Sequence, residues 1–299
     1  MSAMLADDFE IVGLAGDGEQ VLEAAHHTDP DLIVLDVTMP GLNGFKACRA
    51  LESRGSRARV VFLSMHDGDE YVSEAFRSGG RGYVLKGRAG QDLASALDHV
   101  LAGRVFVPSL TSLFHLAGDG RGHAMQVHGD EADFLDGTAD FFHLALQRGD
   151  ATCLIATPAL REGLTHRLEK RGWNVGGSAH PRFLVIDAAE ALERFMRDGC
   201  PDPTRLAEIA EELDQFRLAT AEGSSPRLTI FGNMVMPLIA SGNSMAAIAL
   251  ERLWNMLTHG LPFFTLCGYS QECFHGHHEH DLLGGACGEH WAVSHAPGM

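Results

Sequence analysis

The stretch Asp31-Leu-Ile-Val-Leu-Asp36-Val-Thr-Met-Pro40-Gly41-Leu-Asn-Gly44 decides the fold that we expect for this chain. Its four consecutive apolar residues, 32–35, predict a short strand that is buried on both faces. The strand brings one carboxylate, that of Asp36, to its carboxyl end, which is the edge where open α/β sheets bind ligands. The Pro-Gly pair and the second glycine that follow predict a turn before the next helix.

Two further apolar runs end in polar residues of the kinds that a phosphoryl site requires. Residues 59–63 predict a buried strand that ends at the hydroxyl of Ser64, and residues 82–85 predict one that ends at the ammonium group of Lys86. A phosphoryl site needs a carboxylate nucleophile, a donor for the new phosphoryl oxygens and a cation that neutralises them. The ends of three strands therefore predict a phosphoryl-accepting site.

Residues 9–105 resemble the receiver domain of two-component response regulators, of the kind usually joined to a helix-turn-helix output. The resemblance rests on Phe9-Glu-Ile-Val-Gly13 with Ala15-Gly-Asp-Gly18, and on Val34-Leu-Asp-Val-Thr-Met-Pro-Gly41. It implies that a histidine kinase or a phosphotransfer protein phosphorylates this part of the chain. The roles that it implies are phosphoacceptor for Asp36, switch hydroxyl for Ser64, switch aromatic for Tyr83 and phosphate-neutralising lysine for Lys86.

The acidic pair that ends the first strand of a receiver, and that holds the Mg²⁺ used in phosphorylation, has no counterpart here. Asp7-Asp8 directly precedes the expected second strand, and no apolar run stands before it. Mg²⁺ demands several oxygen ligands, so Asp36 would form only an incomplete magnesium site. Two readings follow, a recorded start that is too late or a degenerate receiver, and we favour the late start.

The order of predicted elements indicates an α/β protein with two domains, each built on a doubly wound parallel sheet. We expect a receiver with a flavodoxin-like fold at residues 1–105, a linker at 106–122, and a second domain at 123–299. The predicted strands of the first domain lie near 11–15, 31–35, 59–63 and 82–85, and its helices near 18–28, 44–54, 69–78 and 90–102. Residues 105–116 predict a short helix within a turn-rich linker.

The composition restricts the function classes. The net charge of −17 is spread over both halves, so no basic face for nucleic acid is evident. No apolar run approaches the roughly 20 residues that span a bilayer, and the amino terminus lacks the pattern of a signal peptide. We therefore expect a cytoplasmic protein that binds neither DNA nor membrane by itself, with mostly reduced cysteines.

The second domain resembles the MEDS domain, a sensory module named after methanogens, methylotrophs and a regulator of dichloromethane metabolism, and regarded as a relative of RecA/KaiC-type ATPases. The ordered motifs that carry the resemblance are His123, Gly149-Asp-Ala-Thr-Cys-Leu-Ile-Ala-Thr-Pro158, Gly232-Asn-Met-Val235, Ala247-Ile-Ala-Leu-Glu251-Arg-Leu-Trp-Asn255, Leu266-Cys-Gly-Tyr269 and Cys287-Gly-Glu-His290. The resemblance implies a degenerate RecA/KaiC-like fold. The segment 157–163 lacks the glycines and lysine of a phosphate-binding loop, so neither nucleotide binding nor hydrolysis is expected.

A small-molecule ligand is instead expected at the carboxyl ends of the second set of strands. The residues expected around that crevice are Thr157, Asp187, Asn233 and Tyr269. Each is equally well explained as a satisfied polar group at a strand end, and Asp187 and Asn233 are also plausible helix N-caps. The resembled family commonly has Glu at the position of Asn233.

Residues 267–290 are rich in histidine and cysteine. Cys267, Cys273, His275, His277, His278, His280 and Cys287 lie close together, but their spacing is irregular for zinc ligands, and an exposed loop is the favoured interpretation. His290 matches the family pattern, and a buried histidine that bonds to backbone explains it equally well.

Together these patterns predict a signalling protein, not an enzyme, in which phosphorylation of Asp36 alters the surface formed by residues 69–102. The alternative is a phosphate-independent pseudoreceiver that acts as a scaffold for a signalling partner. A third reading, an enzyme with a degenerate nucleotide fold, ranks lowest because no nucleophile–base pair is visible. The oligomeric state is left open, with a homodimer among the alternatives.

Overall fold

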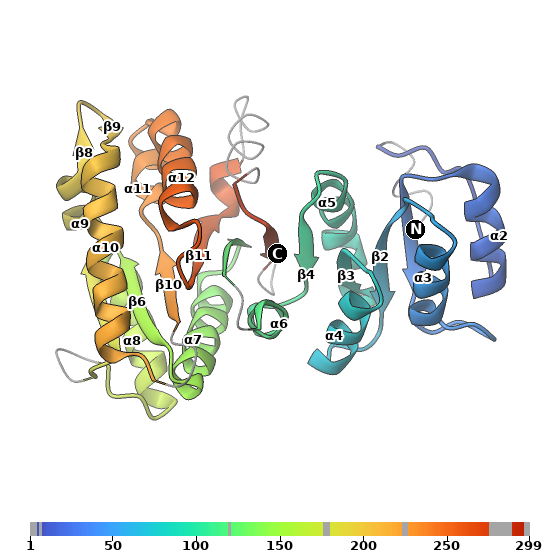
Figure 1. The fold of residues 1–299 in the computed structure, drawn as a ribbon, viewed down its shortest axis with the longest axis horizontal. Coiled ribbons are helices and arrows are strands. Elements are labelled where there is room, and N and C mark those ends of the chain that lie inside the picture. The colour runs from blue at the N-terminus through green and yellow to red at the C-terminus, as the bar shows by residue number, and fades with distance from the viewer. Residues whose placement is uncertain are drawn as a thin grey trace. The chain divides into compact units, whose positions relative to one another are not determined.

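The computed structural model describes Leu5 and residues 8–118, 121–175, 180–222, 227–274 and 289–295. The chain divides into two compact units, residues 1–108 and residues 109–299, and each is described by itself. Both units alternate strands and helices, and within each unit the main strands run parallel to their neighbours (Figure 1). The α/β class predicted from the sequence is therefore confirmed.

The described residues of unit 1 form four parallel strands in the order β1-β2-β3-β4. Its strands are β1 (Leu32–Asp36), β2 (Arg59–Ser64), β3 (Gly82–Leu85) and β4 (Val105–Val107). Its helices are α2 (Gly18–Thr28), α3 (Gly44–Ser53), α4 (Asp69–Arg77) and α5 (Ala89–Leu101), with the 3-10 turn η1 (Lys86–Arg88) before the last. The predicted elements from residue 18 to residue 102 are thus found within one or two residues of their expected bounds.

The strand predicted near residues 11–15 is not formed, and this prediction was wrong. The segment has no strand structure, and its apolar side chains are exposed, with Leu14 at 80% and Val12 at 48%. The physical reason is the lack of a partner, because an isolated strand cannot satisfy its backbone hydrogen bonds. Among the described residues β1 pairs with β2 alone. Because β1 has a neighbouring strand on one side only in this part of the chain, residues 32–34 are partly exposed, whereas Leu35 is buried.

The predicted linker, residues 106–122, holds more regular structure than expected. Its first residues belong to β4, which pairs with β3 in unit 1. The short helix predicted at 105–116 is α6 (Leu110–Ala117), which begins after an N-cap at Ser109 and packs against α7 of unit 2. A strand replaces the first part of the predicted helix because residues 105–107, Val-Phe-Val, favour extended structure and find a neighbouring strand.

In the part of unit 2 that the structure describes, six parallel strands follow the order β12-β5-β11-β10-β6-β7. These strands are β5 (Gly122–His128), β6 (Ala151–Ala156), β7 (Phe183–Asp187), β10 (Leu228–Gly232), β11 (Phe263–Ser270) and β12 (Ala292–His295). Its further helices are α7 (Glu131–Arg148), α8 (Pro158–Lys170), α9 (Ala188–Phe195), α10 (Pro203–Thr220), α11 (Val235–Ala240) and α12 (Ser244–Thr258). The strands β8 (Met196–Arg197) and β9 (Cys200–Pro201) form a small antiparallel hairpin, and the 3-10 turn η2 (Gln271–Phe274) follows β11.

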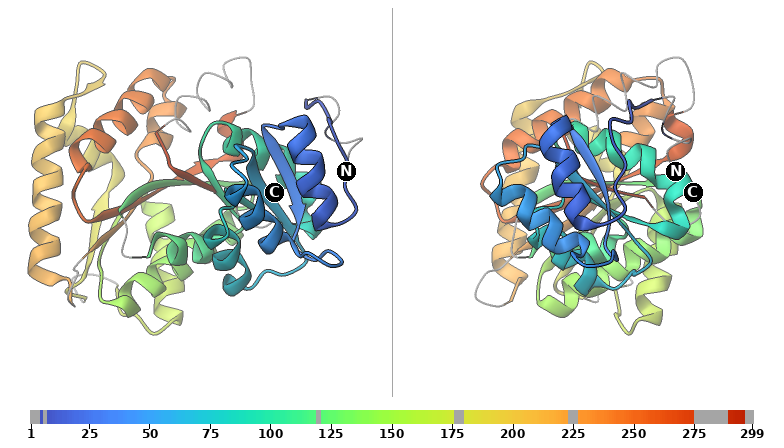
Figure 2. Two further views of the ribbon diagram at one scale, coloured as in Figure 1. Left: turned by 45° about the vertical axis from the view of Figure 1, so that its right-hand side comes forward. Right: turned by 90° about the vertical axis from the view of Figure 1, so that its right-hand side faces the viewer.

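Helices cover both faces of the unit 2 sheet. The helix pair α7 and α8 packs on one face, and α9, α10, α11 and α12 form a contacting group on the other (Figure 2). The central strands β6 and β10 are buried along their whole length, which explains their continuous apolar sequences. The strands therefore carry their carboxyl-terminal residues to one common edge of the sheet.

Short polar side chains start several helices of unit 2. Asp130, Asp187, Asp202 and Asn243 each accept hydrogen bonds from backbone N–H groups in the first turn of α7, α9, α10 and α12, respectively. The predicted cap at Asp187 is therefore confirmed. The predicted cap at Asn233 was wrong, because α11 begins later and its N-cap position is Met234.

A buried ion pair joins the beginnings of β6 and β10. Arg227 and Asp150 are 1% and 2% exposed, and the guanidinium Nε of Arg227 lies 2.9 Å from Oδ2 of Asp150. The hydroxyl of Thr229 donates to the same oxygen at 2.7 Å, and the guanidinium lies 4.8 Å from the ring centroid of Phe114. Because both charges are removed from water, each depends on the other for compensation.

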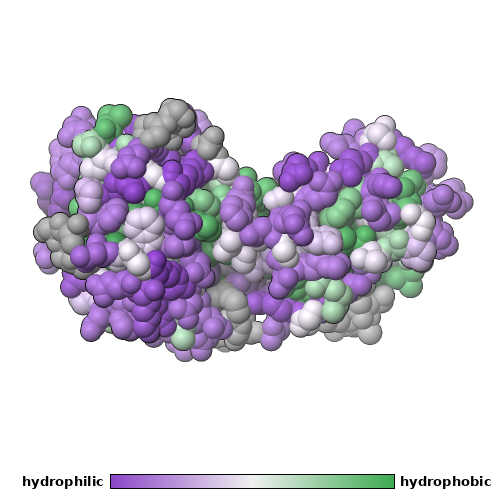
Figure 3. All heavy atoms as spheres, turned by 90° about the horizontal axis from the view of Figure 1, so that it is seen from below, coloured by the Kyte–Doolittle hydropathy of each residue, from purple (hydrophilic) through white to green (hydrophobic). Residues whose placement is uncertain are grey.

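The face of the molecule shown in Figure 3 is mostly hydrophilic, with hydrophobic side chains in scattered places. This agrees with the acidic composition of the chain. In the part of the chain that the structure describes, none of the helices has the length and apolar character needed to cross a lipid bilayer.

Candidate functional site

The phosphoacceptor predicted from the sequence stands at the end of β1. The backbone N–H of Thr38 donates to Oδ1 of Asp36 at 2.9 Å, and Nζ of Lys86 contacts Oδ2. The side chains of Asp36 and Lys86 are each 33% exposed. The carboxylate therefore remains reachable from solvent while it faces a cation, as a phosphoryl-accepting group must.

A glycine lets the start of the next helix pack closely against the backbone of Asp36. A Cβ atom on Gly44, the first residue of α3, would lie 2.3 Å from the carbonyl oxygen of Asp36 and 3.0 Å from Cα of Val37. Both are backbone atoms, which cannot move aside as a flexible side chain can. Only glycine therefore allows α3 to begin so close to the end of β1.

Ser64 and Tyr83 meet at the loop between β2 and α4. The buried hydroxyl of Ser64 accepts a hydrogen bond from the backbone N–H of His66 at 3.0 Å, and the hydroxyl of Tyr83 donates to the carbonyl of His66 at 2.7 Å. Burial raises the pKa of Tyr83, and a hydrogen bond with Ser64 acts in the opposite direction. The two side chains thus fix one loop residue from both sides.

The parallel register places this pair next to Asp36. Asp36 lies opposite Leu63 on β2, one residue before Ser64, and Ser64 lies opposite Leu85 on β3, one residue before Lys86. The structure therefore brings Asp36, Ser64 and Lys86 to the carboxyl ends of three adjacent strands, and Tyr83 lies within the third of these strands, β3.

The predicted magnesium site at Asp36 is poorly supplied with ligands. Asp8, the described member of the Asp7-Asp8 pair, is exposed, and no group of three or more acidic, histidine or cysteine donors gathers around Asp36 in the described ranges. A hard cation such as Mg²⁺ needs several oxygen ligands. The described residues alone do not fit Mg²⁺.

The four residues predicted around a ligand crevice in unit 2 occupy the same edge of the sheet, but in different surroundings. Thr157 and Asn233 directly follow β6 and β10, and both are partly exposed. Asp187 ends β7 and is occupied as the cap of α9. Tyr269 lies inside β11 and is 1% exposed. It therefore belongs to the interior of the unit and not to its rim.

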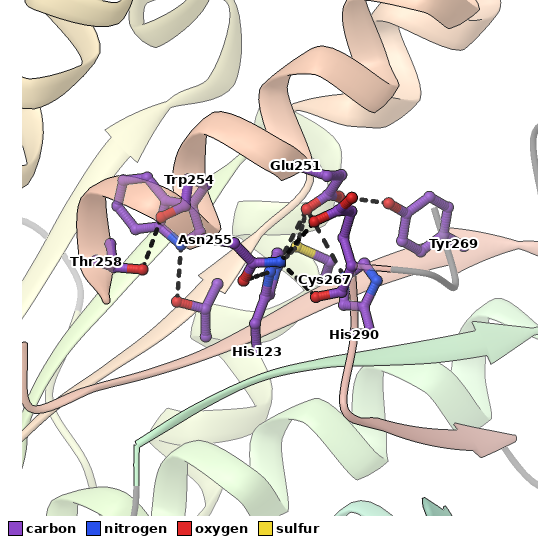
Figure 4. A network of polar contacts seen from close by, with 10 residues as sticks. His123, Glu251, Trp254, Asn255, Thr258, Cys267, Tyr269 and His290 are labelled. Atoms are coloured by element: carbon purple, nitrogen blue, oxygen red, sulfur yellow. Dashed lines mark hydrogen bonds and ion pairs between the residues drawn. The ribbon is translucent and has the colours of Figure 1, made fainter. Parts of the chain in front are cut away.

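The hydroxyl of Tyr269 donates a hydrogen bond to Glu251, which belongs to a buried polar network (Figure 4). This network was not predicted from the sequence. The side chains of His123, Glu251, Cys267 and His290 are all buried, and their donor atoms lie within 4.8 Å of one another. Nε2 of His123 lies 3.1 Å from Sγ of Cys267 and 3.1 Å from Oε2 of Glu251. We call these four residues the tetrad.

The tetrad draws its members from separate elements. His123 comes from β5, Glu251 from α12, Cys267 from β11, and His290 from the segment before β12. Each lay within a motif that carried the family resemblance, so the signal existed in the sequence. It could not be combined there because His123 and Cys267, for example, are 144 positions apart.

The carboxyl group of Glu251 is ionised despite its burial. Burial raises its pKa, but the imidazoles of His123 and His290, with hydrogen bonds from His123 and Tyr269, outweigh burial and lower the pKa to about 2. Burial and the charge of Glu251 raise the pKa of the Cys267 thiol well above its usual value. The tetrad therefore holds an ionised carboxylate beside two imidazoles and a neutral thiol inside the unit.

A cavity of about 20 Å³ adjoins the tetrad. Its lining includes Glu251 and Cys267 together with apolar side chains such as Ile155 and Trp254. This volume suffices for roughly one water molecule, whereas small-molecule pockets usually measure about 300–1,000 Å³. None of the four predicted rim residues lines this cavity, and the predicted small-molecule ligand stays a prediction.

The histidine-rich segment 275–288 lies outside the described residues, as does the side chain of Cys273. The expectation of an exposed loop there stays a prediction. Of the cysteines in that cluster, Cys267 is described, and it is buried within the tetrad.

Comparisons with known proteins agree with the two units. Residues 1–98 match the response regulator receiver domain, and residues 122–284 match the MEDS domain, the MEthanogen/methylotroph, DcmR Sensory domain. The resemblances predicted from the sequence are therefore confirmed. A relationship of unit 2 to RecA-type proteins is not tested by these matches.

Curated relatives match through the first unit. The chain is 40% identical over 101 residues to the nitrate/nitrite response regulator protein NarL of Escherichia coli K12, covering 34% of this chain and 47% of that protein. It is 35% identical over 103 residues to the transcriptional regulatory protein MctR of Rhizobium johnstonii, covering 34% and 48%. The chain thus spans about half the length of these relatives.

Among solved structures, the receiver domain of a NarL-type regulator from Mycobacterium tuberculosis is 31% identical, with a TM-score of 0.33 and coverage of 34% of this chain and 84% of that chain. With a receiver domain at residues 1–98 and a sensory-domain match that extends over more than half of its length, the chain belongs to the family of proteins that carry the MEthanogen/methylotroph, DcmR Sensory domain.

Proposed function

We propose that this chain is a response regulator that accepts a phosphoryl group on Asp36 from a histidine kinase or a phosphotransfer protein, and that its MEDS domain is coupled to this event. The observation that carries the proposal is the contact between the side chains of Asp36 and Lys86, which stand at the carboxyl ends of β1 and β3, the two parallel strands on either side of β2. The receiver relatives, which are named as response regulators, support the same class.

The chemistry follows from the groups at the strand ends. An oxygen of Asp36 attacks phosphorus, the bond from phosphorus to the donor nitrogen breaks, and the donor histidine keeps the electron pair and takes up a proton. The ammonium group of Lys86 then neutralises part of the added negative charge. The N–H of Thr38 and the hydroxyl of Ser64 are the neighbouring donors for the new oxygens.

The change is passed on through the loop that Ser64 and Tyr83 hold. When the Ser64 hydroxyl turns toward the phosphoryl group, the hydrogen bond from the His66 N–H to Ser64 weakens, and the bond from Tyr83 to the His66 carbonyl is disturbed with it. The loop leads directly into α4, so the proposed output surface is formed by α4, β3 and α5. A signalling partner or the MEDS domain reads this surface.

We further propose that the chain acts as a regulator and not as an enzyme, and that it does not bind DNA by itself. Its match to the curated regulators covers about a third of its length, and both of its halves are acidic. A nucleic-acid-binding face requires clustered positive charge.

The proposal is tested by phosphorylation of the purified full chain. The chain is incubated with acetyl phosphate in Mg²⁺ buffer, or with a phosphorylated histidine kinase domain, and is analysed by phosphate-affinity electrophoresis. One acid- and hydroxylamine-sensitive phosphoryl group is expected, and it should be absent from Asp36→Asn. Asp31→Asn is the matched control, since Asp31 is an exposed aspartate just before the same strand.

Equal labelling of Asp36→Asn and the unmodified chain would place the phosphoryl group elsewhere and end this proposal. If the unmodified chain takes up no phosphoryl group from either donor, the phosphate-independent scaffold becomes the better account. Lys86→Met should accept the group but fail to change the protection of residues 66–77 in hydrogen exchange, because the cation that couples charge to the loop is lost.

A further inference from the structure

The tetrad has the composition and arrangement of a metal site. It offers one cysteine sulfur, two imidazole nitrogens and one carboxylate oxygen, each from a residue that is no more than 7% exposed. The thiol of Cys267 binds zinc as a thiolate and releases its proton to solvent when the ion binds. Sulfur and nitrogen donors suit zinc and similar transition metals, whereas Mg²⁺ and Ca²⁺ prefer oxygen alone. We propose that His123, Glu251, Cys267 and His290 bind one Zn²⁺ ion inside the MEDS domain.

The distances between donor atoms fit a tetrahedral ion. Bonds of about 2.0–2.3 Å to zinc place neighbouring donors about 3.3–3.7 Å apart. Nε2 of His123 lies 3.1 Å from both Sγ of Cys267 and Oε2 of Glu251. Oε2 of Glu251 lies 3.8 Å from Sγ of Cys267 and 3.7 Å from Nε2 of His290. The remaining donor pairs lie within 4.8 Å, so an ion fits among the four atoms once the donors draw together by up to about 1 Å.

Outer hydrogen bonds orient the donors. Nδ1 of His123 donates to Oδ1 of Asn255 at 2.8 Å, so Nδ1 keeps its proton, and Nε2, which faces the centre, is the nitrogen that gives up its proton to bind the ion. The amide nitrogen of Asn255 donates to Glu289, which fixes which way the amide points. The hydroxyl of Tyr269 donates to Oε1 of Glu251, leaving Oε2 toward the tetrad (Figure 4). Such partners are a regular part of metal sites.

The charges also balance. A buried site is stable only when its charges are compensated. One thiolate and one carboxylate supply two negative charges, and Zn²⁺ with two neutral imidazoles supplies two positive ones. Four protein ligands leave no open position, so the proposed site is structural or regulatory and not hydrolytic. This inference does not depend on phosphorylation of Asp36.

The test measures metal content in the full chain without a histidine tag. The protein is purified after growth with zinc, dialysed, and analysed by plasma mass spectrometry, with one zinc ion per chain as the expected result. Cys267→Ser and Glu251→Gln should each lose the ion. Cys153→Ser is the matched control, since Cys153 is equally buried on the nearby strand β6 and lies outside the tetrad. It should retain zinc.

Two further variants and a cobalt experiment test whether the tetrad is what binds the zinc. Replacing His275, His277, His278 and His280 together with alanine should leave the zinc in place, because these residues are outside the tetrad. Asn255→Ala should keep the fold and weaken zinc affinity by about 10- to 100-fold, as removal of an orienting partner does. Cobalt exchanged into the unmodified chain should show thiolate-to-cobalt charge transfer and the intense visible bands of a tetrahedral ion.

The proposal is overturned if the unmodified chain binds no zinc after exposure to the ion, or if zinc stays in Cys267→Ser and leaves with the four histidines of residues 275–280. It is also overturned if exchanged cobalt shows octahedral bands without thiolate charge transfer. This last measurement needs no variant, so it remains decisive when a tetrad variant fails to fold.

Discussion

Removing the carboxylate of Asp150 should strongly destabilise the MEDS domain. In Asp150→Ala the guanidinium of Arg227, which is 1% exposed, loses its buried counter-charge, and the hydroxyl of Thr229 loses its acceptor at 2.7 Å. Breaking a buried ion pair from one side costs about 3–5 kcal/mol. For a unit of this size, that loss corresponds to a fall in Tm of roughly 6–20 °C.

Asp140→Ala is the matched control for this prediction. Asp140 also pairs with an arginine, since its Oδ1 lies 2.8 Å from Nε of Arg171, but its side chain is 51% exposed. An exposed pair contributes only about 0–1 kcal/mol. The two substitutions remove the same group, so the difference between them isolates the effect of burial.

Urea denaturation followed by tryptophan fluorescence measures both variants in the full chain. All three tryptophans, at positions 173, 254 and 291, lie in unit 2, so the signal reports on that unit alone. If Asp150→Ala and Asp140→Ala lose equal free energy of unfolding, the reasoning about burial is refuted. Replacing Asp150 and Arg227 together with leucine and methionine should recover much of the loss, because no buried charge is then left uncompensated.

Two further predictions concern acid stability and the phosphoacceptor loop. Burial lowers the pKa of His128 to about 4, against an opposing effect of Asp130, so the unfolded chain binds a proton there more readily than the folded one. Stability should therefore fall as the pH drops from about 6.5 toward 4, and a His128→Gln variant should show a smaller fall in urea titrations across that range. Gly44→Ala should destabilise unit 1 by about 1–3 kcal/mol through its clash with the backbone of Asp36, whereas Gly90→Ala, in open space within α5, should stabilise it by about 0.5–1 kcal/mol. Circular dichroism in urea distinguishes the two, and a stable Gly44→Ala chain would contradict the packing argument.

The sequence predicted those elements whose signal is local. Continuous apolar runs such as residues 60–63 become buried strands, and Asp187 is a helix cap as expected. The strand near residues 11–15 fails as a prediction because strand formation depends on a partner, which an apolar pattern cannot report. The two-residue strands of the β8–β9 hairpin are too short to produce any periodic signal.

The two candidate sites also differ in how far they could be predicted from the sequence. Asp36, Ser64 and Lys86 could be placed from the sequence because each stands at the carboxyl end of a recognisable strand, and parallel strands carry those ends to one edge of the sheet. The tetrad could not be placed from the sequence, because His123 on β5 and Glu251 on α12 come together only through the order of the strands in the sheet. Tyr269 was expected at the rim of the ligand crevice. It is buried because it lies within β11, and the apolar residues before it in the sequence do not show that the strand extends past it.

The strand order of unit 2 also bears on how the chain acquires its fold during synthesis. The strand β5 is the first of the described strands in this unit to leave the ribosome, yet its two neighbours in the sheet, β11 and β12, are the last. Pairings between such distant segments form slowly, and the waiting edge is open to aggregation. Nascent chains of this protein should consequently rely on chaperones until translation is nearly finished.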